Sequence, residues 1–158
     1  MAIVALRDIE ETDMDALFDQ MRDPESVRMA AFTARDPDDR AAFDAHQRKM
    51  RDTPEILRRA VTLDGEFVGV VGSFYMEGDR EVMYWIDRRY WGRGIASRAL
   101  GLLLELDKTR PIYGHVASDN LGSLHVLTKA GFMPIGTARG FAQARGEEIE
   151  ETVLRLGE

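Results

Sequence analysis

The chain of 158 residues contains no cysteine. This absence excludes disulfide bonds, thiolate-ligated metal sites and a cysteine nucleophile. Histidine is also scarce, and His46, His115 and His125 are not spaced as metal ligands on one helix would be, so we predict no metal site. We expect His115 and His125 to be structural or surface side chains.

Long hydrophobic runs are missing as well. The longest apolar runs, such as residues 67–71, are too short to span a bilayer. Residues 1–8 lack the basic flank and apolar stretch of a signal peptide, so we expect a cytoplasmic protein. The formal net charge of −7 argues against nucleic acid or an anionic membrane as a partner. It is compatible with a cationic substrate such as an amine, although acidity also serves solubility.

The composition is that of an ordinary globular protein. Hydrophobic residues make up 44% of the chain and charged residues 31%. A chain of this length can bury a substantial core without covalent cross-links. We therefore predict a single domain over residues 1–158.

The first third of the chain predicts a strand and two helices. Residues 3–9 favour a strand, and the helix after it should end at Pro24, because the residue before a proline avoids helical conformations. We expect a polar loop over residues 23–38. Pro37 suits the first turn of a second helix that runs to about Met50.

The rest of the chain alternates strand and helix signals. Asp64-Gly65 suits a tight hairpin turn, in which both central residues have positive φ. An apolar stripe at helical spacing follows Gly94. The remaining patterns predict strands over residues 60–63, 67–73, 81–86, 111–117, 132–137 and 148–156, and a helix over 121–129. Together they predict an α/β fold (α+β mixed), with a central mixed, mostly antiparallel sheet of about seven strands and helices on both faces.

A glycine-rich segment, Arg89-Tyr90-Trp91-Gly92-Arg93-Gly94, lies between a predicted strand and a predicted helix. Glycines let backbone N–H groups approach an anion, and the helix N-terminus adds a favourable dipole. Arg88 and Arg98 add to the basic residues of this segment. We predict a phosphate-binding loop, and the alternative is a glycine turn with solvated arginines. The dinucleotide and nucleoside-triphosphate fingerprints do not fit.

The segment Arg89-x-x-Gly92-x-Gly94 resembles the Arg/Gln-x-x-Gly-x-Gly/Ala motif of the GNAT acetyltransferase superfamily. Asn120-x-x-Ser123, followed by Lys129-Ala130-Gly131-Phe132, resembles that superfamily's next helix and its Gly-Phe ending. Leu6-Arg7, Asp23-Pro24-Glu25 and Tyr84-Trp85 resemble the branch that acetylates ribosomal-protein N-termini and various small amines. The resemblance spans nearly the whole chain and is strongest over residues 60–133.

This resemblance implies acetyl-CoA as the cosubstrate, with its pyrophosphate on the glycine-rich segment. It also implies that backbone groups at residues 85–87 hold the pantetheine and polarise the acetyl carbonyl. The cofactor-binding residues implied in this way are Trp85, Ile86, Asp87, Arg89, Trp91, Gly92, Arg93, Gly94, Ile95, Ala96, Asn120, Ser123 and Lys129.

The resemblance implies catalytic roles for two side chains. Glu81 stands where the family often keeps a glutamate that acts as a base through water, and the alternative is a solvated residue at the start of a strand. Ser123 is the predicted proton donor to the leaving thiolate, because Leu127 stands where many relatives have a tyrosine. Since cysteine is absent, we expect direct attack by a primary amine in a ternary complex.

The acceptor amine is not readable from the sequence. It should be a protein N-terminus or a small molecule, bound between the first two helices and the last hairpin by Phe32, Arg35 and Phe141. We expect a monomer or homodimer. One alternative is a CoA-binding sensor without transferase activity. Another is a structural interaction module, which leaves the glycine-rich segment unexplained.

Overall fold

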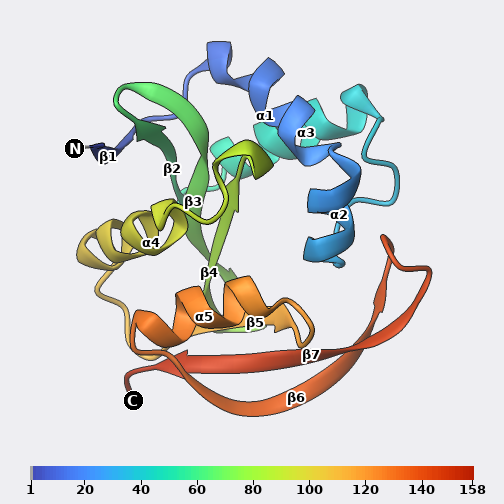
Figure 1. Ribbon diagram of the computed structural model, residues 1–158, viewed down its shortest axis with the longest axis vertical. Coiled ribbons are helices and arrows are strands. Elements are labelled where there is room, and N and C mark those ends of the chain that lie inside the picture. The colour runs from blue at the N-terminus through green and yellow to red at the C-terminus, as the bar shows by residue number, and fades with distance from the viewer. Residues whose placement is uncertain (1) are drawn as a thin grey trace.

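The computed structural model describes residues 2–158, which form a seven-stranded sheet in the order β1-β2-β3-β4-β5-β7-β6 (Figure 1). Neighbouring strands are antiparallel, except that β4 and β5 run parallel. The predicted mixed, mostly antiparallel sheet is confirmed. The strands are β1 (Val4–Arg7), β2 (Leu57–Leu63), β3 (Glu66–Met76), β4 (Asp79–Ile86), β5 (Ile112–Ala117), β6 (Met133–Ala142) and β7 (Glu147–Leu156).

The helices of residues 2–158 are α1 (Met14–Met21), α2 (Pro24–Ala30), α3 (Arg40–Arg51), α4 (Ile95–Leu106) and α5 (Leu121–Lys129), with short 3-10 turns η1 (Glu11–Asp13) and η2 (Arg88–Tyr90). The predicted helices after Gly94 and over residues 121–129 are confirmed. In this part of the chain no helix is both long and apolar enough to cross a membrane.

Helix α2 corrects the prediction of a polar loop over residues 23–38. The Asp23 carboxylate accepts the backbone N–H of Ser26 at 3.0 Å, and Pro24 occupies the first helical turn. Proline is favoured there because the first N–H groups of a helix have no intrahelical acceptor. The proline that ends α1 therefore also begins α2. Helix α3 begins at Arg40, later than predicted.

The turn between β2 and β3 has the predicted conformation. Asp64 has φ 51° and Gly65 has φ 87°, as the two central residues of a tight hairpin of this kind require. Glu77 and Gly78 repeat the pattern between β3 and β4, with φ 51° and 89°. Both hairpins therefore fix the register of the antiparallel half of the sheet.

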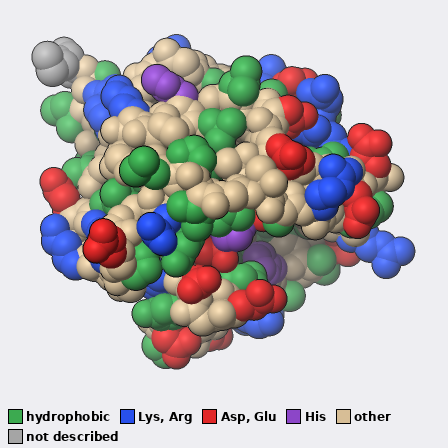
Figure 2. All heavy atoms as spheres, turned by 90° about the horizontal axis from the view of Figure 1, so that it is seen from below, with side chains coloured by type: hydrophobic (Ala, Val, Ile, Leu, Met, Phe, Trp, Pro, Cys, Tyr) green, Lys and Arg blue, Asp and Glu red, His purple; other side chains and the backbone are tan. Residues whose placement is uncertain are grey.

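Helices cover both faces of the sheet, as predicted (Figure 1). Successive residues of β3 point to opposite faces. Val71 belongs to the main core, which includes Leu100 of α4 and Leu127 of α5. Val70 belongs to a second core with Leu17 of α1. Seen from below, the surface carries interspersed hydrophobic, acidic and basic side chains, so charges of both signs occur across this face (Figure 2).

Strands β4 and β5 separate soon after they meet. Their ladder has a single paired position, Glu81 with Tyr113. Strand β5 is instead paired along its whole length with β7. Beyond Glu81 the edge of β4 is therefore not bonded to β5, and the sheet opens in its middle.

Candidate active site

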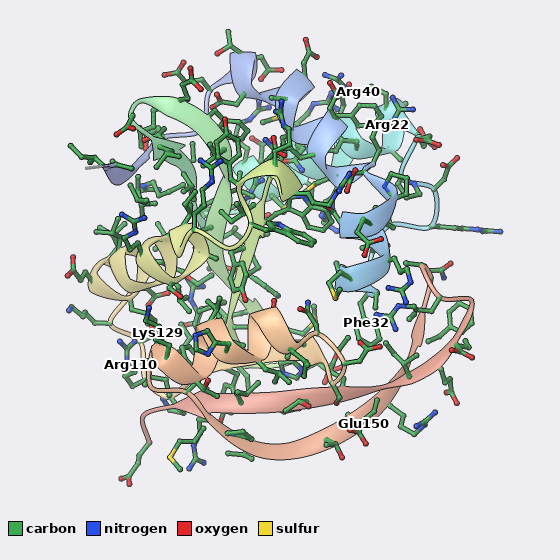
Figure 3. The ribbon with its side chains drawn as sticks, in the orientation of Figure 1. Arg22, Phe32, Arg40, Arg110, Lys129 and Glu150 are labelled. Atoms are coloured by element: carbon green, nitrogen blue, oxygen red, sulfur yellow. The ribbon has the colours of Figure 1, made fainter. Side chains whose placement is uncertain are left out.

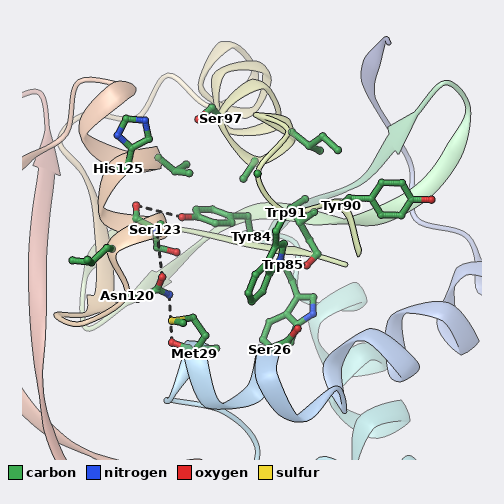
Figure 4. Close-up of a pocket in the computed structure, with 18 of the residues that line it drawn as sticks. Ser26, Met29, Tyr84, Trp85, Tyr90, Trp91, Ser97, Asn120, Ser123 and His125 are labelled. Carbon is green, nitrogen blue, oxygen red and sulfur yellow. Dashed lines mark hydrogen bonds between the residues drawn. The ribbon is translucent and has the colours of Figure 1, made fainter. Parts of the chain in front are cut away.

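A cavity of about 630 Å³ lies where β4 and β5 diverge (Figure 4). Its volume is in the range of small-molecule sites. Its walls come from β4, the segment 90–94 with the start of α4, helix α5 and helix α2. The predicted cofactor-binding residues that line it are Trp85, Ile86, Trp91, Gly92, Gly94, Ile95, Ala96, Asn120, Ser123 and Lys129.

The N-terminus of α4 faces this cavity without a capping side chain. Its N-cap residue, Gly94, has φ 75°, a left-handed conformation that glycine adopts without strain. Gly92 has φ 80°. Because no side chain caps the helix, the first backbone N–H groups, at Ile95 and Ala96, are available to an anion. The helix dipole adds to this preference for negative charge.

Two of the four arginines near the loop, Arg88 and Arg89, are paired with carboxylates. Arg88 donates to both oxygens of Asp23, at 2.7 and 3.1 Å, and this contact lowers the pKa of Asp23 to about 2. Arg89 donates to Asp87 at 2.7 Å, and its side chain is 82% exposed. Asp87, Arg89 and Arg93 do not line the cavity. Asp23 and Asp87 therefore neutralise part of the positive charge that the sequence places around the glycine-rich segment.

Backbone groups at the end of β4 divide between the two sides of the strand. The N–H of Asp87 donates to the carbonyl of Val68 at 2.9 Å, so it is not free for a ligand. Residues two apart on a strand direct their N–H groups to the same side. The N–H of Trp85 therefore also faces β3, and that of Ile86 faces the gap. The Ile86 carbonyl already accepts the Trp91 indole N–H, at 2.9 Å.

Helix α5 is connected to α2 across the cavity (Figure 4). Asn120 caps α5 by accepting the N–H of Ser123 at 3.2 Å, and its Nδ2 donates to the Met29 carbonyl at 3.4 Å. The Tyr84 hydroxyl donates to the Ser123 carbonyl at 3.5 Å. Burial raises the pKa of Tyr84, which keeps this hydroxyl protonated.

Glu81 lies outside the cavity wall, at the β4–β5 bridge. Its side chain is 12% exposed, and its Oε2 is 3.6 Å from Nε2 of His115. Nδ1 of His115 is 2.7 Å from Oε1 of Glu151. Burial raises the pKa of Glu81, the His115 charge opposes this shift, and the Glu151 charge adds to it. Glu81 is therefore not a fully solvated strand residue.

A family model described as an acetyltransferase (GNAT) domain matches residues 4–133. This chain belongs to the GNAT acetyltransferase family. It is therefore a transferase of the acyltransferase class, and the cavity with the glycine-rich segment is the candidate active site of a GNAT enzyme. No curated protein sequence matches the chain.

Solved GNAT structures share the fold. Spermidine N-acetyltransferase from Vibrio cholerae, in complex with CoA and spermine, is 17% identical with a TM-score of 0.82, over 97% of this chain and 94% of that one. RimJ from Mycobacterium smegmatis, in complex with CoA-disulfide, is 21% identical with a TM-score of 0.78, over 97% and 81%. Ribosomal-protein-alanine N-acetyltransferase from Brucella melitensis is 18% identical with a TM-score of 0.74, over 98% and 99%.

The predicted acceptor-binding residues of this GNAT chain do not reach the cavity. Phe32 lies between the end of α2 and the β6–β7 hairpin (Figure 3). Its ring is close to Gly140 of the hairpin, because a Cβ atom added to that glycine would be 3.4 Å from the Phe32 ring. Phe141 is exposed on the hairpin, and Arg35 is exposed in the loop before α3. Their role in acceptor binding stays a prediction.

Sequence reasoning missed the contribution of α2 to the GNAT cavity. Ser26, Met29 and Ala30 line it, yet residues 23–38 were expected to form a loop. Asp23 before Pro24 was the available signal, because an aspartate followed by proline is a good helix start. Tyr84, which packs against the main core, also lines the cavity. Within residues 2–158, no group of three or more His, Asp or Glu side chains is arranged to hold a metal ion.

Proposed function

We propose that this protein transfers an acetyl group from acetyl-CoA to a primary amine, a protein N-terminus or a small molecule, by direct attack in a ternary complex. The observation that carries the proposal is the uncapped N-terminus of α4 facing a cavity at the opening between β4 and β5. The amine acceptors named for the structural neighbours, spermine and ribosomal proteins, support this class of acceptor. A cytoplasmic location and a monomeric or homodimeric state stay predictions.

The residues of the cavity fit the donor substrate. Acetyl-CoA supplies an activated thioester acyl group and carries a pyrophosphate. The pyrophosphate would bind at Gly92, Gly94 and the first N–H groups of α4. Lys129, at the end of α5, would add positive charge. The N–H of Ile86, directed into the gap, would bind the pantetheine arm of acetyl-CoA.

Two proton transfers accompany the reaction. The acceptor's ammonium group must lose a proton before its nitrogen can attack, and Glu81 is the proposed base. The leaving thiolate gains a proton, for which Ser123 is the proposed donor. The Tyr84 hydroxyl lies next to Ser123 and is a second candidate for this role. All three groups come from β4 or α5, the elements that border the opening in the sheet.

A panel of amines tests the proposal directly. Spermidine, spermine, single amino acids and a peptide with a free N-terminal alanine would be incubated with acetyl-CoA, and release of free CoA measured. Calorimetry of acetyl-CoA binding accompanies the assay. We expect binding and turnover of at least one amine. Binding without any turnover would favour a CoA-binding sensor, and absence of binding would contradict both functions.

A further inference from the structure

A carboxylate–imidazole–carboxylate cluster lies on three strands of the sheet: Glu81 of β4, His115 of β5 and Glu151 of β7. Glu81 shares its face of β4 with Trp85, which packs in the core on the α1 side. His115 shares its face of β5 with Ala117, which packs against Ala31 after α2. The cluster therefore lies on the face opposite α4 and α5.

The hydrogen bonding of His115 leaves one ring nitrogen turned toward Glu81. A carboxylate only accepts, so the 2.7 Å contact with Glu151 places an N–H on Nδ1. In the neutral ring Nε2 is then an acceptor, and it faces Oε2 of Glu81 at 3.6 Å. That separation is too long for a hydrogen bond. Two acceptors thus face each other with room for a donor that contacts both.

An ammonium group fits this gap. A nitrogen at about 2.9 Å from each acceptor, the usual hydrogen-bond length, is compatible with two acceptors 3.6 Å apart. The surrounding charge is negative: Glu77, in the β3–β4 turn, and Asp79, the first residue of β4, also act on Glu81. In the described part of the chain, the ion-pair partner of both Glu81 and Glu151 is His115. The side chains of His115 and Glu151 are 32% and 21% exposed, so a ligand can reach them.

We propose that the acceptor's ammonium group binds between Glu81 and His115, that His115 accepts its proton, and that Glu151 is a positioning residue which fixes the His115 tautomer. This inference rests on the proposed acetyl transfer. It assigns the proton to His115 instead of Glu81, whose carboxylate then binds the ammonium group and stabilises the imidazolium. It extends the role of Glu81 to a shared site with an imidazole, the side chain best suited to proton exchange near neutral pH.

Acetyl transfer to the ammonium group requires two protons to leave the nitrogen. The ammonium group, R–NH₃⁺, gives one proton to Nε2 of His115, and the imidazolium is stabilised by the carboxylates of Glu81 and Glu151. The freed lone pair forms the bond from nitrogen to the acetyl carbon, and the carbon–sulfur bond breaks. The donor hydroxyl, Ser123 or Tyr84, gives a proton to the thiolate and regains one from the nitrogen, and His115 releases its proton to solvent. The net products are the amide, CoA thiol and one proton.

Nuclear magnetic resonance tests the positioning role without turnover. The ¹⁵N chemical shifts of the His115 ring report which nitrogen carries the proton, and the variants His46→Gln and His125→Gln assign the signals. We expect the Nδ1–H form to predominate in the neutral ring of the wild type and to decline in Glu151→Gln. Glu150→Gln is the matched control, because Glu150 is the adjacent, exposed residue of β7 (Figure 3). An unchanged tautomer in Glu151→Gln would overturn the positioning role.

Kinetics test the proton transfer on whichever amine of the panel is turned over. We expect His115→Gln to lower kcat at neutral pH by about 10²-fold, the lower end for general acid–base residues, and to recover partly at alkaline pH, where the amine deprotonates unaided. We expect Glu151→Gln to lower the maximal kcat, because it removes the carboxylate that fixes the His115 tautomer. His46→Gln and Glu150→Gln should match the wild type.

Three outcomes separate the inference from the proposed function. A His115→Gln variant with wild-type kcat and pH profile would overturn this inference while acetyl transfer stands. If His115→Gln raises KM for the amine and leaves kcat unchanged, the cluster binds the amine but His115 does not accept its proton, and this inference is overturned. A wild-type protein that binds no acetyl-CoA, or turns over no amine, would overturn the proposed function and this inference with it.

Discussion

The Arg88 guanidinium donates to both carboxylate oxygens of Asp23, and the same carboxylate caps α2 through the N–H of Ser26. One aspartate thus joins the segment that precedes α4 to the helix that lines the opposite wall of the cavity. Residues 65 positions apart in the chain are held together at the site by this contact.

Substitutions of Asp23 should separate its two roles. Asp23→Ala removes both the ion pair and the cap, and we expect it to lower the free energy of unfolding by about 1 kcal/mol through the cap alone. Asp23→Asn keeps a good N-cap and removes the charge, so its loss of stability should be smaller. Urea unfolding at pH 7 measures both changes. Equal losses in the two variants would contradict a capping role.

The same pair predicts a pH dependence. The pKa of Asp23 is lowered to about 2 in the folded protein, from an ordinary value near 3.8. A lowered carboxyl pKa stabilises the fold above the unfolded-state pKa, and this contribution is lost as the pH falls through about 2. The difference in stability between the wild type and Asp23→Asn should therefore shrink between about pH 4 and pH 2. A difference that stays constant over that window would contradict the pair.

A buried network at the other end of α4 should matter more for stability. Asp107 accepts from the Ser73 hydroxyl at 2.6 Å and from Arg80 Nε at 2.8 Å. The side chains of Arg80 and Asp107 are 8% and 6% exposed. Despite the burial, these hydrogen bonds hold the pKa of Asp107 well below its usual range.

Asp107→Asn should be strongly destabilising. It leaves the Arg80 guanidinium buried beside a neutral amide, and breaking one partner of a buried pair typically costs about 3–5 kcal/mol. Because the pKa of Asp107 is lowered, its contribution is present above the unfolded-state pKa and is lost as the pH falls. Denaturant unfolding of Asp107→Asn beside the exposed control Asp64→Asn measures the effect. Similar stability of the two variants would contradict it.

The sequence predicted best those features whose signals are local. The Asp64-Gly65 turn, the helix after Gly94 and the helix over residues 121–129 each follow from a turn dipeptide, a glycine or a regular apolar spacing. Most of the predicted cofactor-binding residues line one cavity because they lie on these well-marked elements.

Features that depend on tertiary contacts were not predictable in this way. The Glu81–His115–Glu151 cluster requires β5 to insert between β4 and β7, and no local pattern encodes that order of strands. The pairing of Arg88 with Asp23 likewise depends on how α2 packs. The acceptor-binding residues were assigned to the space between the first two predicted helices and the last hairpin. Part of the segment expected as a loop there is helix α2.

Gly94→Glu should abolish acetyl-CoA binding. The substitution places a negative side chain at the N-terminus of α4, where the pyrophosphate is proposed to bind, and strains a residue with φ 75°. Gly65→Glu is the matched control, because Gly65 also has positive φ and open space around it but lies in the β2–β3 turn. In calorimetry the control should bind normally. Normal binding by Gly94→Glu would contradict the assignment of the loop.

The two hydroxyls beside the opening in the sheet, Ser123 and Tyr84, should be distinguishable by kinetics. Because a thiolate is a good leaving group near neutrality, loss of its proton donor should lower kcat by less than the roughly 10²–10⁴-fold typical of general acid–base residues. Whichever of Ser123→Ala and Tyr84→Phe lowers kcat, with acetyl-CoA affinity unchanged in calorimetry, identifies the donor. Tyr75→Phe is the control for loss of a phenol, since Tyr75 is exposed at the end of β3.

If the Ser123 and Tyr84 hydroxyls act as one unit, the double variant should lose no more kcat than the more impaired single variant. Wild-type kcat in the double variant would mean that water protonates the thiolate, and both assignments would be wrong.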